Sequence, residues 1–177
     1  MRHLIRPSIP HDLPAITRLY AHHVLHGTGS FEIDPPDLTE MTRRREEVLS
    51  RGLPYLVAEH EGEVVGYAYA NVFRPRPAYR FAVENSVYVD ATRPRAGVGR
   101  ALMQALIARC ETAGMRQMVA VIGDSANQGS IGLHTALGFQ PAGVLRSTGW
   151  KHGRWLDTVF MQRPLGYGDT QAPPAQA

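Results

Sequence analysis

The chain has 177 residues, and 44% of them are hydrophobic, so we expect one globular domain with a substantial core. The formal net charge is only +3 and the basic residues are scattered, which argues against a nucleic-acid-binding surface. No apolar run approaches the roughly 18 residues of a membrane span, and the single cysteine excludes an internal disulfide framework. These features favour a cytoplasmic protein that binds small molecules, with neither nucleic acid nor membrane as a partner.

The first half of the chain combines strand-like and helix-like patterns. Asp12 is a suitable N-cap for the first helix, and Gly27 is a suitable end for it. A turn at Glu61-Gly62 joins two of the strands. In chain order we predict a strand over residues 4–6, helices over 13–26 and 38–50, and strands over 55–59, 64–73 and 81–90.

The second half continues with alternating helices and strands. Residues 119–122 are continuously apolar, which is typical of a strand in the interior of a sheet. The order β-α-α-β-β-β-α-β-α-β-β predicts a mixed α/β fold in a single domain over residues 1–165. Residues 166–177 are rich in Gly, Pro, Gln and Ala, and we predict a disordered tail there. The elements predicted in this half are helices over 98–111 and 127–137 and strands over 119–122, 142–148 and 155–162.

A turn with two glycines lies between the strand over 81–90 and the helix that begins at residue 98. Its sequence is Arg93-Pro94-Arg95-Ala96-Gly97-Val98-Gly99-Arg100. Glycines let the backbone pass close to a ligand, and the free N–H groups at a helix start attract anions. The third glycine of a dinucleotide fingerprint is missing, and so is the Gly-Lys-Ser/Thr of an NTPase phosphate loop. The turn is either a phosphate site of another kind or a loop of solvated arginines.

Two longer motifs are more specific: Val-Glu-x-Ser-Val-Tyr-Val at residues 83–89 and Lys-x-Gly-x-Trp-x-Asp at residues 151–157. With these motifs the chain resembles the GNAT family of N-acetyltransferases, and within it the phosphinothricin and methionine sulfoximine acetyltransferase group. The family's cofactor signature is Gln/Arg-x-x-Gly-x-Gly/Ala, and this chain has Pro94 at its first position. Proline lacks a backbone donor, and we hypothesise that Arg93 and Arg95 compensate through their side chains.

The resemblance implies a mixed, mainly antiparallel central sheet flanked by helices. It implies an enzyme that moves acetyl from acetyl-CoA directly to the α-amine of a small amino-acid analogue, such as L-phosphinothricin or L-methionine sulfoximine or sulfone. A homodimer is implied as well. The residues that it assigns to acetyl-CoA are Val87, Tyr88, Val89, Arg95, Ala96, Gly97, Val98, Gly99, Arg100 and Asn127.

Acetyl transfer to an amine requires a proton acceptor for the amine and donors for the oxyanion and the departing thiolate. The family's proposed general base is the glutamate that matches Glu84, which strand alternation places on the same face as Ser86 and Tyr88. His134 lies about two helical turns after Asn127, where many family members carry the tyrosine that protonates the thiolate. Because histidine titrates near neutrality, His134 is the candidate proton donor. From pattern alone, Glu84 would be a surface glutamate, Asn127 a helix cap and His134 an ordinary histidine.

The group's substrate contacts map to the segment that enters the strand over 81–90. Arg74, Tyr79 and Arg80 lie there, and planar guanidinium groups suit carboxylate and phosphinate oxygens. Ser86 and Phe31 complete the candidate set, and Phe31 lies in the loop that in the family closes over the acceptor. The alternative is a solvated loop of Arg and Pro.

Other functions stay open at this point. One is a GNAT enzyme for a protein N-terminus, a polyamine or an aminoglycoside, and another is a non-catalytic domain that senses acyl-CoA or binds nucleic acid. His22 and His26 have the spacing of metal ligands, but no third ligand is indicated, so we predict no metal site. Cys110 lies on the apolar stripe of its helix and is interpreted as a buried structural thiol.

Overall fold

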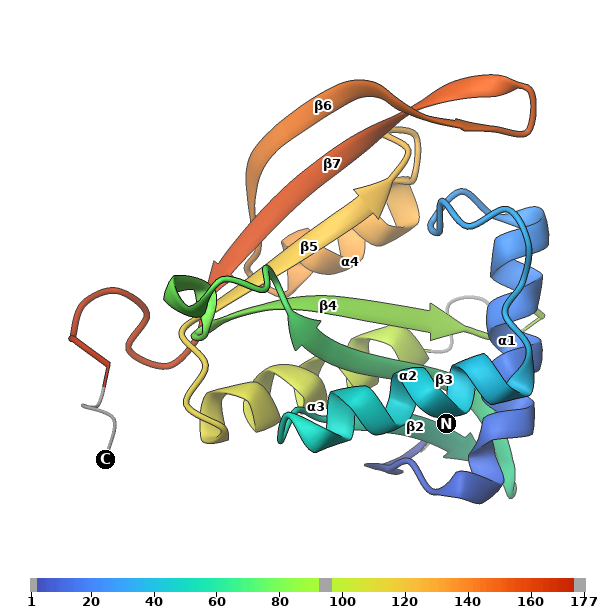
Figure 1. Ribbon diagram of the computed structural model, residues 1–177, viewed down its shortest axis with the longest axis horizontal. Helices are drawn as coiled ribbons and strands as arrows, with labels where there is room; N and C mark the ends of the chain where they lie inside the picture. The colour runs from blue at the N-terminus through green and yellow to red at the C-terminus, as the bar shows by residue number, and fades with distance from the viewer. Residues whose placement is uncertain (1–2, 93–96, 174–177) are drawn as a thin grey trace.

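The computed structural model describes residues 3–92 and 97–173 and has one sheet of seven strands (Figure 1). The strand order is β1-β2-β3-β4-β5-β7-β6, and every neighbouring pair is antiparallel except β4 and β5. The predicted mixed, mainly antiparallel sheet is thus confirmed. The strands are β1 Leu4–Pro7, β2 Tyr55–His60, β3 Glu63–Val72, β4 Ala82–Val89, β5 Gln117–Gly123, β6 Gln140–Lys151 and β7 Arg154–Pro164.

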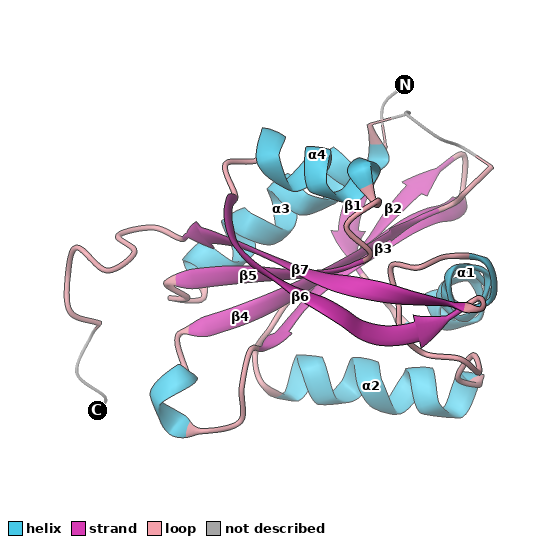
Figure 2. Ribbon diagram, turned by 90° about the horizontal axis from the view of Figure 1, so that it is seen from above, coloured by secondary structure: helices cyan, strands magenta, loops and turns pink. Residues whose placement is uncertain are grey.

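Helices cover both faces of this sheet. Figure 2 shows α2 on one face and α3 and α4 on the other. Two short 3-10 helices, at Pro10–Asp12 and Pro77–Tyr79, were not predicted. Within the described ranges, no helix is both long and apolar enough to cross a lipid bilayer. The α-helices are α1 Leu13–His26, α2 Leu38–Ser50, α3 Val98–Thr112 and α4 Gln128–Ala136.

The two faces of the sheet have different cores. On the α3 face, Leu102, Leu106 and Cys110 are fully buried. Burial raises the pKa of the Cys110 thiol to about 12, which agrees with its interpretation as a buried structural thiol. On the α2 face, stacked tyrosine rings from β2, β3 and β4 form a layer that the ring of Tyr20 from α1 joins edge-on. The stacked members are Tyr55, Tyr67, Tyr69 and Tyr88.

The C-terminal strands are longer than the sequence predicts. β6 and β7 pair up to Lys151 and Arg154, and only His152 and Gly153, both with positive φ, form the turn. Such a two-residue turn lets both strands continue to its edge. Irregular register around Gly143 and Gly149 interrupts the alternation of β6, and this is why the pattern gave a shorter strand. In the predicted tail, residues 166–169 form a turn and residues 170 and 171 a bend, and the Arg116 guanidinium lies 5.5 Å from the centre of the Tyr167 ring.

β4 and β5 separate part-way along their length. Their parallel pairing covers only Ala82 to Asn85 on β4, against Gln117 to Ala120 on β5. Beyond Asn85, β4 remains paired with β3 on its other edge. The outer half of β4 therefore has one edge that faces no strand, and this edge positions the candidate site.

Candidate active site

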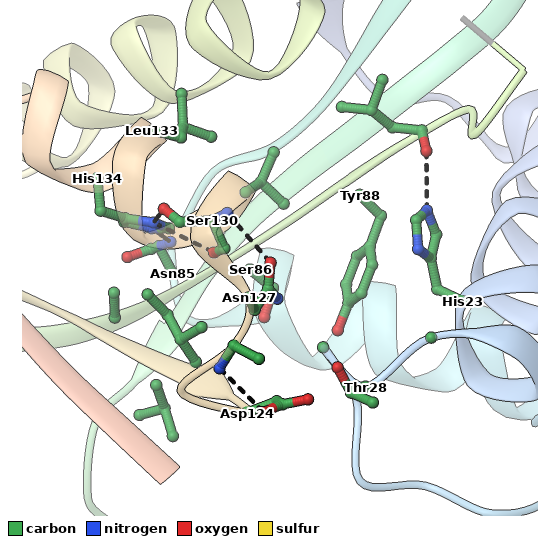
Figure 3. Close-up of a pocket in the computed structure, with 18 of the residues that line it drawn as sticks. His23, Thr28, Asn85, Ser86, Tyr88, Asp124, Asn127, Ser130, Leu133 and His134 are labelled. Carbon is green, nitrogen blue, oxygen red and sulfur yellow. Dashed lines mark hydrogen bonds between the residues drawn. The ribbon is translucent and has the colours of Figure 1, made fainter. Parts of the chain in front are cut away.

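A cleft of about 620 Å³ opens where β4 and β5 separate (Figure 3). Residues 85–89 of β4 form one wall and residues 120–122 of β5 form another. The end of α1 and the loop after it contribute His23 and residues 27–29, and α4 contributes residues including Asn127 and His134. The cleft thus lies between the end of α1 and the first turns of α4, at the free edge of β4.

The free edge of β4 presents backbone N–H groups to the cleft. Ala82 accepts a bond from the N–H of Phe73 (3.1 Å) and Asp90 donates to the carbonyl of Val65 (2.9 Å), so even-numbered residues bond to β3. Because backbone groups alternate along a strand, the N–H groups of Val87 and Val89 point to the other edge, into the cleft. These two N–H groups are therefore available as donors to a ligand in the cleft.

His23 is a cleft residue that the sequence analysis missed. Its Nε2 donates to the carbonyl oxygen of Val89 at 2.8 Å, and burial lowers the pKa of the ring, so the neutral form is favoured. The bond ties α1 to the end of β4. The sequence gave little indication of this role, because the i,i+4 spacing of metal ligands pairs the neighbouring His22 with His26 and leaves His23 out. In the described part of the chain, no three histidine, cysteine or acidic side chains cluster as metal ligands would.

The described part of the predicted phosphate turn is the start of α3. Gly97 is its N-cap with φ of +77°, a conformation that favours glycine. A Cβ on Gly99 would contact Leu133 and Val89 at 3.4 and 3.5 Å, so this glycine packs beside the cleft. Val98 is buried and Arg100 is exposed. Arg95 and Ala96, together with Arg93 and Pro94, lie outside the described residues.

Asn127 is both a helix cap and a cleft residue. Its side-chain oxygen accepts a bond from the N–H of Ser130 at 3.2 Å, which caps α4. The same side chain lines the cleft. The structural and the functional interpretation of Asn127 are therefore compatible.

His134 is almost fully buried, with 2% of its surface exposed, and both ring nitrogens have partners. Nδ1 donates to the carbonyl of Ser130 at 2.8 Å, so Nε2 accepts from the Asn85 amide at 2.9 Å. Burial lowers the pKa of His134, which favours the neutral ring. In this arrangement Nε2 carries no proton and is bonded to Asn85, and the proton-donor role of His134 stays a prediction. Asn85, which that analysis did not single out, keeps a buried Oδ1 without a partner.

Glu84 projects from the opposite face of β4. It pairs across the strands with Asn71, on the side of the tyrosine layer, whereas Asn85 faces α3 and α4. Burial raises the pKa of the Glu84 carboxyl, and the positive charge of Arg74 partly opposes this shift. Within residues 3–92 and 97–173 the carboxylate has no hydrogen-bond partner, and it does not line the 620 Å³ cleft. Glu84 is therefore an unengaged, half-buried carboxylate.

The predicted substrate residues divide into two groups. Ser86 lines the cleft. The other group surrounds the short helix before β4: Arg74 lies over the Phe73 ring at 5.0 Å, and Arg80 lies over the Phe81 ring at 4.6 Å. Tyr79 packs edge-on against the same Phe73 ring. None of these three residues lines the cleft. Arg74 is near enough to Glu84 for its positive charge to act on the carboxyl.

Phe31 packs against the backbone of β5 and β6. Its ring packs over two backbone positions, where a Cβ on Gly149 would lie 2.5 Å from the ring and one on Gly123 would lie 2.8 Å from it. Only glycine at both positions permits this approach. The loop between α1 and α2 is thereby seated on β5 and β6, beside the cleft.

The family model described as the acetyltransferase (GNAT) family matches residues 17–139. The chain belongs to this family. It is 60% identical over 162 residues to a phosphinothricin N-acetyltransferase of Alcaligenes faecalis, covering 92% of this chain and 82% of that protein. It is 41% identical over 162 residues to an L-methionine sulfoximine/L-methionine sulfone acetyltransferase of Pseudomonas aeruginosa, covering 91% of this chain and 94% of that protein. A crystal structure of a phosphinothricin acetyltransferase from Sinorhizobium meliloti in complex with AcCoA has a TM-score of 0.96 at 47% identity, covering 98% and 94%.

The features of the cleft suit the acetyl-CoA chemistry of a GNAT acetyltransferase. A free strand edge supplies N–H donors, and the start of α3 supplies an N-terminus for phosphate oxygens. The buried Oδ1 of Asn85 offers an acceptor for an N–H donor. The described residues therefore fit a cosubstrate that combines a phosphate group, amides and a carbonyl.

Proposed function

We propose that this GNAT acetyltransferase acetylates the α-amine of a small amino-acid analogue, L-phosphinothricin or L-methionine sulfoximine or sulfone. The observation that carries this proposal is the 60% identity over 92% of the chain to the phosphinothricin N-acetyltransferase of Alcaligenes faecalis. The 41% identity to the L-methionine sulfoximine/L-methionine sulfone acetyltransferase supports the same class of acceptor. A protein N-terminus, a polyamine and an aminoglycoside are the competing acceptors.

Acetyl-CoA supplies the thioester whose acyl group is transferred. In our proposal the N–H groups of Val87 and Val89 polarise the thioester carbonyl, as preorganised donors do in other acyl transfers. Gly97, Val98, Gly99 and Arg100, with Arg95 and Ala96, would hold the pyrophosphate, and Asn127 and Tyr88 would contact the arm. Their support is the position of the β4 edge and of the α3 start beside one cleft.

Glu84 is proposed as the general base. An α-amine with a pKa near about 8 is mostly protonated at neutral pH, so it must lose a proton before it attacks. A carboxylate whose pKa is raised by burial accepts that proton more readily than an exposed one. Arg74, Tyr79, Arg80, Ser86 and Phe31 would bind the acceptor, and the electrostatic contact of Arg74 with Glu84 supports Arg74 most directly.

His134 is proposed to hold Asn85 in place in the resting enzyme. For Nε2 to donate a proton to a thiolate, the ring must first be protonated at Nε2. The Asn85 amide, which occupies Nε2 in the resting enzyme, must then move aside so that the thiolate accepts that proton. A proton-donor role for His134 thus depends on Asn85.

A homodimer is proposed through the hairpin of β6 and β7. Large apolar side chains on this hairpin are 47–61% exposed, namely Val144, Leu145, Trp150 and Trp155. Contiguous exposed apolar residues on a monomer are typical of a surface that another chain covers. We place the enzyme in the cytoplasm, where its buried single thiol stays reduced.

The test is a CoA-release assay across a panel of amines, with kcat/KM measured for each. We expect the highest value for L-phosphinothricin or for methionine sulfoximine or sulfone, and much lower values for spermidine, kanamycin and an N-terminal peptide. A higher kcat/KM for one of those three would overturn the proposed acceptor class. Absence of CoA release with every amine would instead support a domain that only senses acyl-CoA.

A further inference from the structure

Lys151 is the one lysine in the sequence, since every other basic residue except histidine is an arginine. It stands at the end of β6, directly before the turn at His152 and Gly153. The side chain is buried, with 5% exposed, and its Nζ donates to the carbonyl oxygen of Ser30 at 2.7 Å. Lys151 thus bonds the tip of the hairpin of β6 and β7 to the loop after α1. Figure 1 shows the path of this hairpin and of this loop.

This ammonium is costly for the fold. In the described part of the chain Lys151 forms no ion pair with a carboxylate, and its hydrogen-bond partner is the neutral carbonyl of Ser30. Burial lowers the pKa of Lys151, although the charge of Glu32 partly opposes the shift. Desolvation of an ammonium that has no carboxylate partner costs free energy, and one hydrogen bond to a neutral carbonyl offsets only part of that cost. A reason other than stability is therefore needed for this lysine.

The segment that Lys151 holds carries Phe31. On one side of Phe31, the Ser30 hydroxyl is bonded to the Tyr20 hydroxyl at 2.9 Å, and on the other side the Glu32 carboxylate accepts from Tyr20 (2.7 Å) and Arg44 (2.6 Å). These bonds come from α1 and α2. Lys151 adds the tie to the hairpin, so the backbone beside Phe31 is held from both directions.

The same hairpin also contacts the loop between β5 and α4. Arg154 donates to the Asp124 carboxylate at 2.5 Å, and Asp157 accepts from the Ser125 hydroxyl. His152 lies 3.2 Å from the carbonyl of Gly27. Thr28 and Asp124, from the two loops that the hairpin joins, both line the cleft (Figure 3). The two charged residues of the Lys-x-Gly-x-Trp-x-Asp motif therefore each bond to one of the two loops: Lys151 to the loop after α1 and Asp157 to the loop between β5 and α4.

We infer that Lys151 is a positioning residue, which fixes the Phe31 loop against the hairpin so that the acceptor end of the cleft has its binding shape. This inference rests on the proposed function, because the loop is assigned to the acceptor and not to acetyl-CoA. Ammonium suits the task, since it is compact and reaches one carbonyl on a flexible stem, whereas guanidinium is wide and planar.

The test compares Lys151→Met with Lys151→Arg and with Arg146→Met, which removes an exposed cation (84% exposed) from the same hairpin. We expect Lys151→Met to lower kcat/KM for the acceptor by about 10- to 100-fold through a higher KM, the size of effect known for small misplacements. Its KM for acetyl-CoA and its melting temperature should stay near those of the wild type. Lys151→Arg should recover part of the acceptor KM, and Arg146→Met should change neither KM.

An unchanged acceptor KM in Lys151→Met would overturn the inference, as would an equal rise in both KM values. If Lys151→Met loses melting temperature, a second measurement decides. Protein labelled with 13Cε-lysine gives a single side-chain signal, which should shift on addition of the acceptor and not on addition of CoA alone. No shift with the acceptor contradicts the inference. The acceptor used is whichever amine the wild type acetylates best, so failure of the proposed substrate class is detected separately.

Discussion

The two faces of β4 hold their ionisable side chains in opposite ways. On one face, Glu84 is half-buried beside the tyrosine layer, has a raised pKa and has no hydrogen-bond partner in the described ranges. On the other face, His134 is buried, has a lowered pKa and has a partner on each ring nitrogen. Among the described residues, the Glu84 carboxylate thus has no bond to break before it accepts a proton, whereas both nitrogens of His134 are already bonded.

In our proposal, this difference places the proton transfer on the Glu84 face of β4. A side chain whose polar atoms are all satisfied stabilises the fold, and its removal leaves partners unpaired. An unsatisfied, desolvated carboxylate costs stability and is retained for function. Activity and stability should therefore respond in opposite directions on the two faces.

Glu84→Gln should have the largest effect. Removal of a general base typically lowers turnover by about 10²- to 10⁴-fold, and acetyl-CoA binding should be largely retained. Because burial disfavours the charged carboxylate, glutamine should also leave the melting temperature at pH 7 unchanged or raise it. The measurements are kcat in the CoA-release assay, acetyl-CoA affinity by calorimetry and thermal unfolding. Full turnover in the folded variant would remove Glu84 from the mechanism.

His134→Gln should have the inverse profile. We expect kcat to fall by no more than about ten-fold, while the free energy of unfolding falls by about 1–3 kcal/mol for each partner left unsatisfied, here Ser130 and Asn85. Chemical denaturation and kcat measured on the same preparation check this. A loss of turnover as large as that of Glu84→Gln, without loss of stability, would return the proton-donor role to His134.

Gly149→Ala should give a smaller effect, confined to the acceptor. The added Cβ would lie 2.5 Å from the Phe31 ring, so the ring must move, at a cost of about 1–3 kcal/mol for overpacking. The acceptor KM should rise several-fold and the KM for acetyl-CoA should not. The matched control is Gly132→Ala in α4, which has open space at its Cβ and should stabilise the helix by about 0.5–1 kcal/mol. If both variants leave the acceptor KM unchanged, Phe31 does not bound the acceptor site.

Most of the fold could be predicted from the sequence. α1 and α2 have their predicted bounds, and the predicted order of strands and α-helices is confirmed over the described residues. The predicted cap of α1 was wrong in its detail, because the Asp12 carboxylate bonds to Arg6 and to the N–H of Ile9 and not to the first turn of α1. The hairpin of β6 and β7 was predicted too short because glycines and a proline break its alternation, while pairing across a tight turn restores the strand. The hydrophobic pattern of a segment reflects only the preference of its own residues, whereas the length of β6 and β7 depends on their pairing with each other.

The site was predictable only in part. Strand alternation correctly separates Glu84 from Asn85, but the sequence does not tell which side chains from other elements meet them. Asn85 is a site residue because it bonds to His134, which is 49 residues further along the chain. His23 is one because it bonds to the carbonyl of Val89. Lys151 was seen as part of a family motif, and its contact with Ser30, 121 residues away, gives it a physical role.

The most direct test of the account is the pH dependence of kcat/KM for L-phosphinothricin in the wild type and in Glu84→Gln. A base with a raised pKa is inactivated by protonation at a higher pH than an ordinary carboxyl, so the wild type should lose activity on its acid side above the usual range of glutamate. This acid limb should disappear in Glu84→Gln, which leaves only the limb set by the amine of the substrate. The same acid limb in both proteins would contradict the assignment of the chemistry to the Glu84 face of β4.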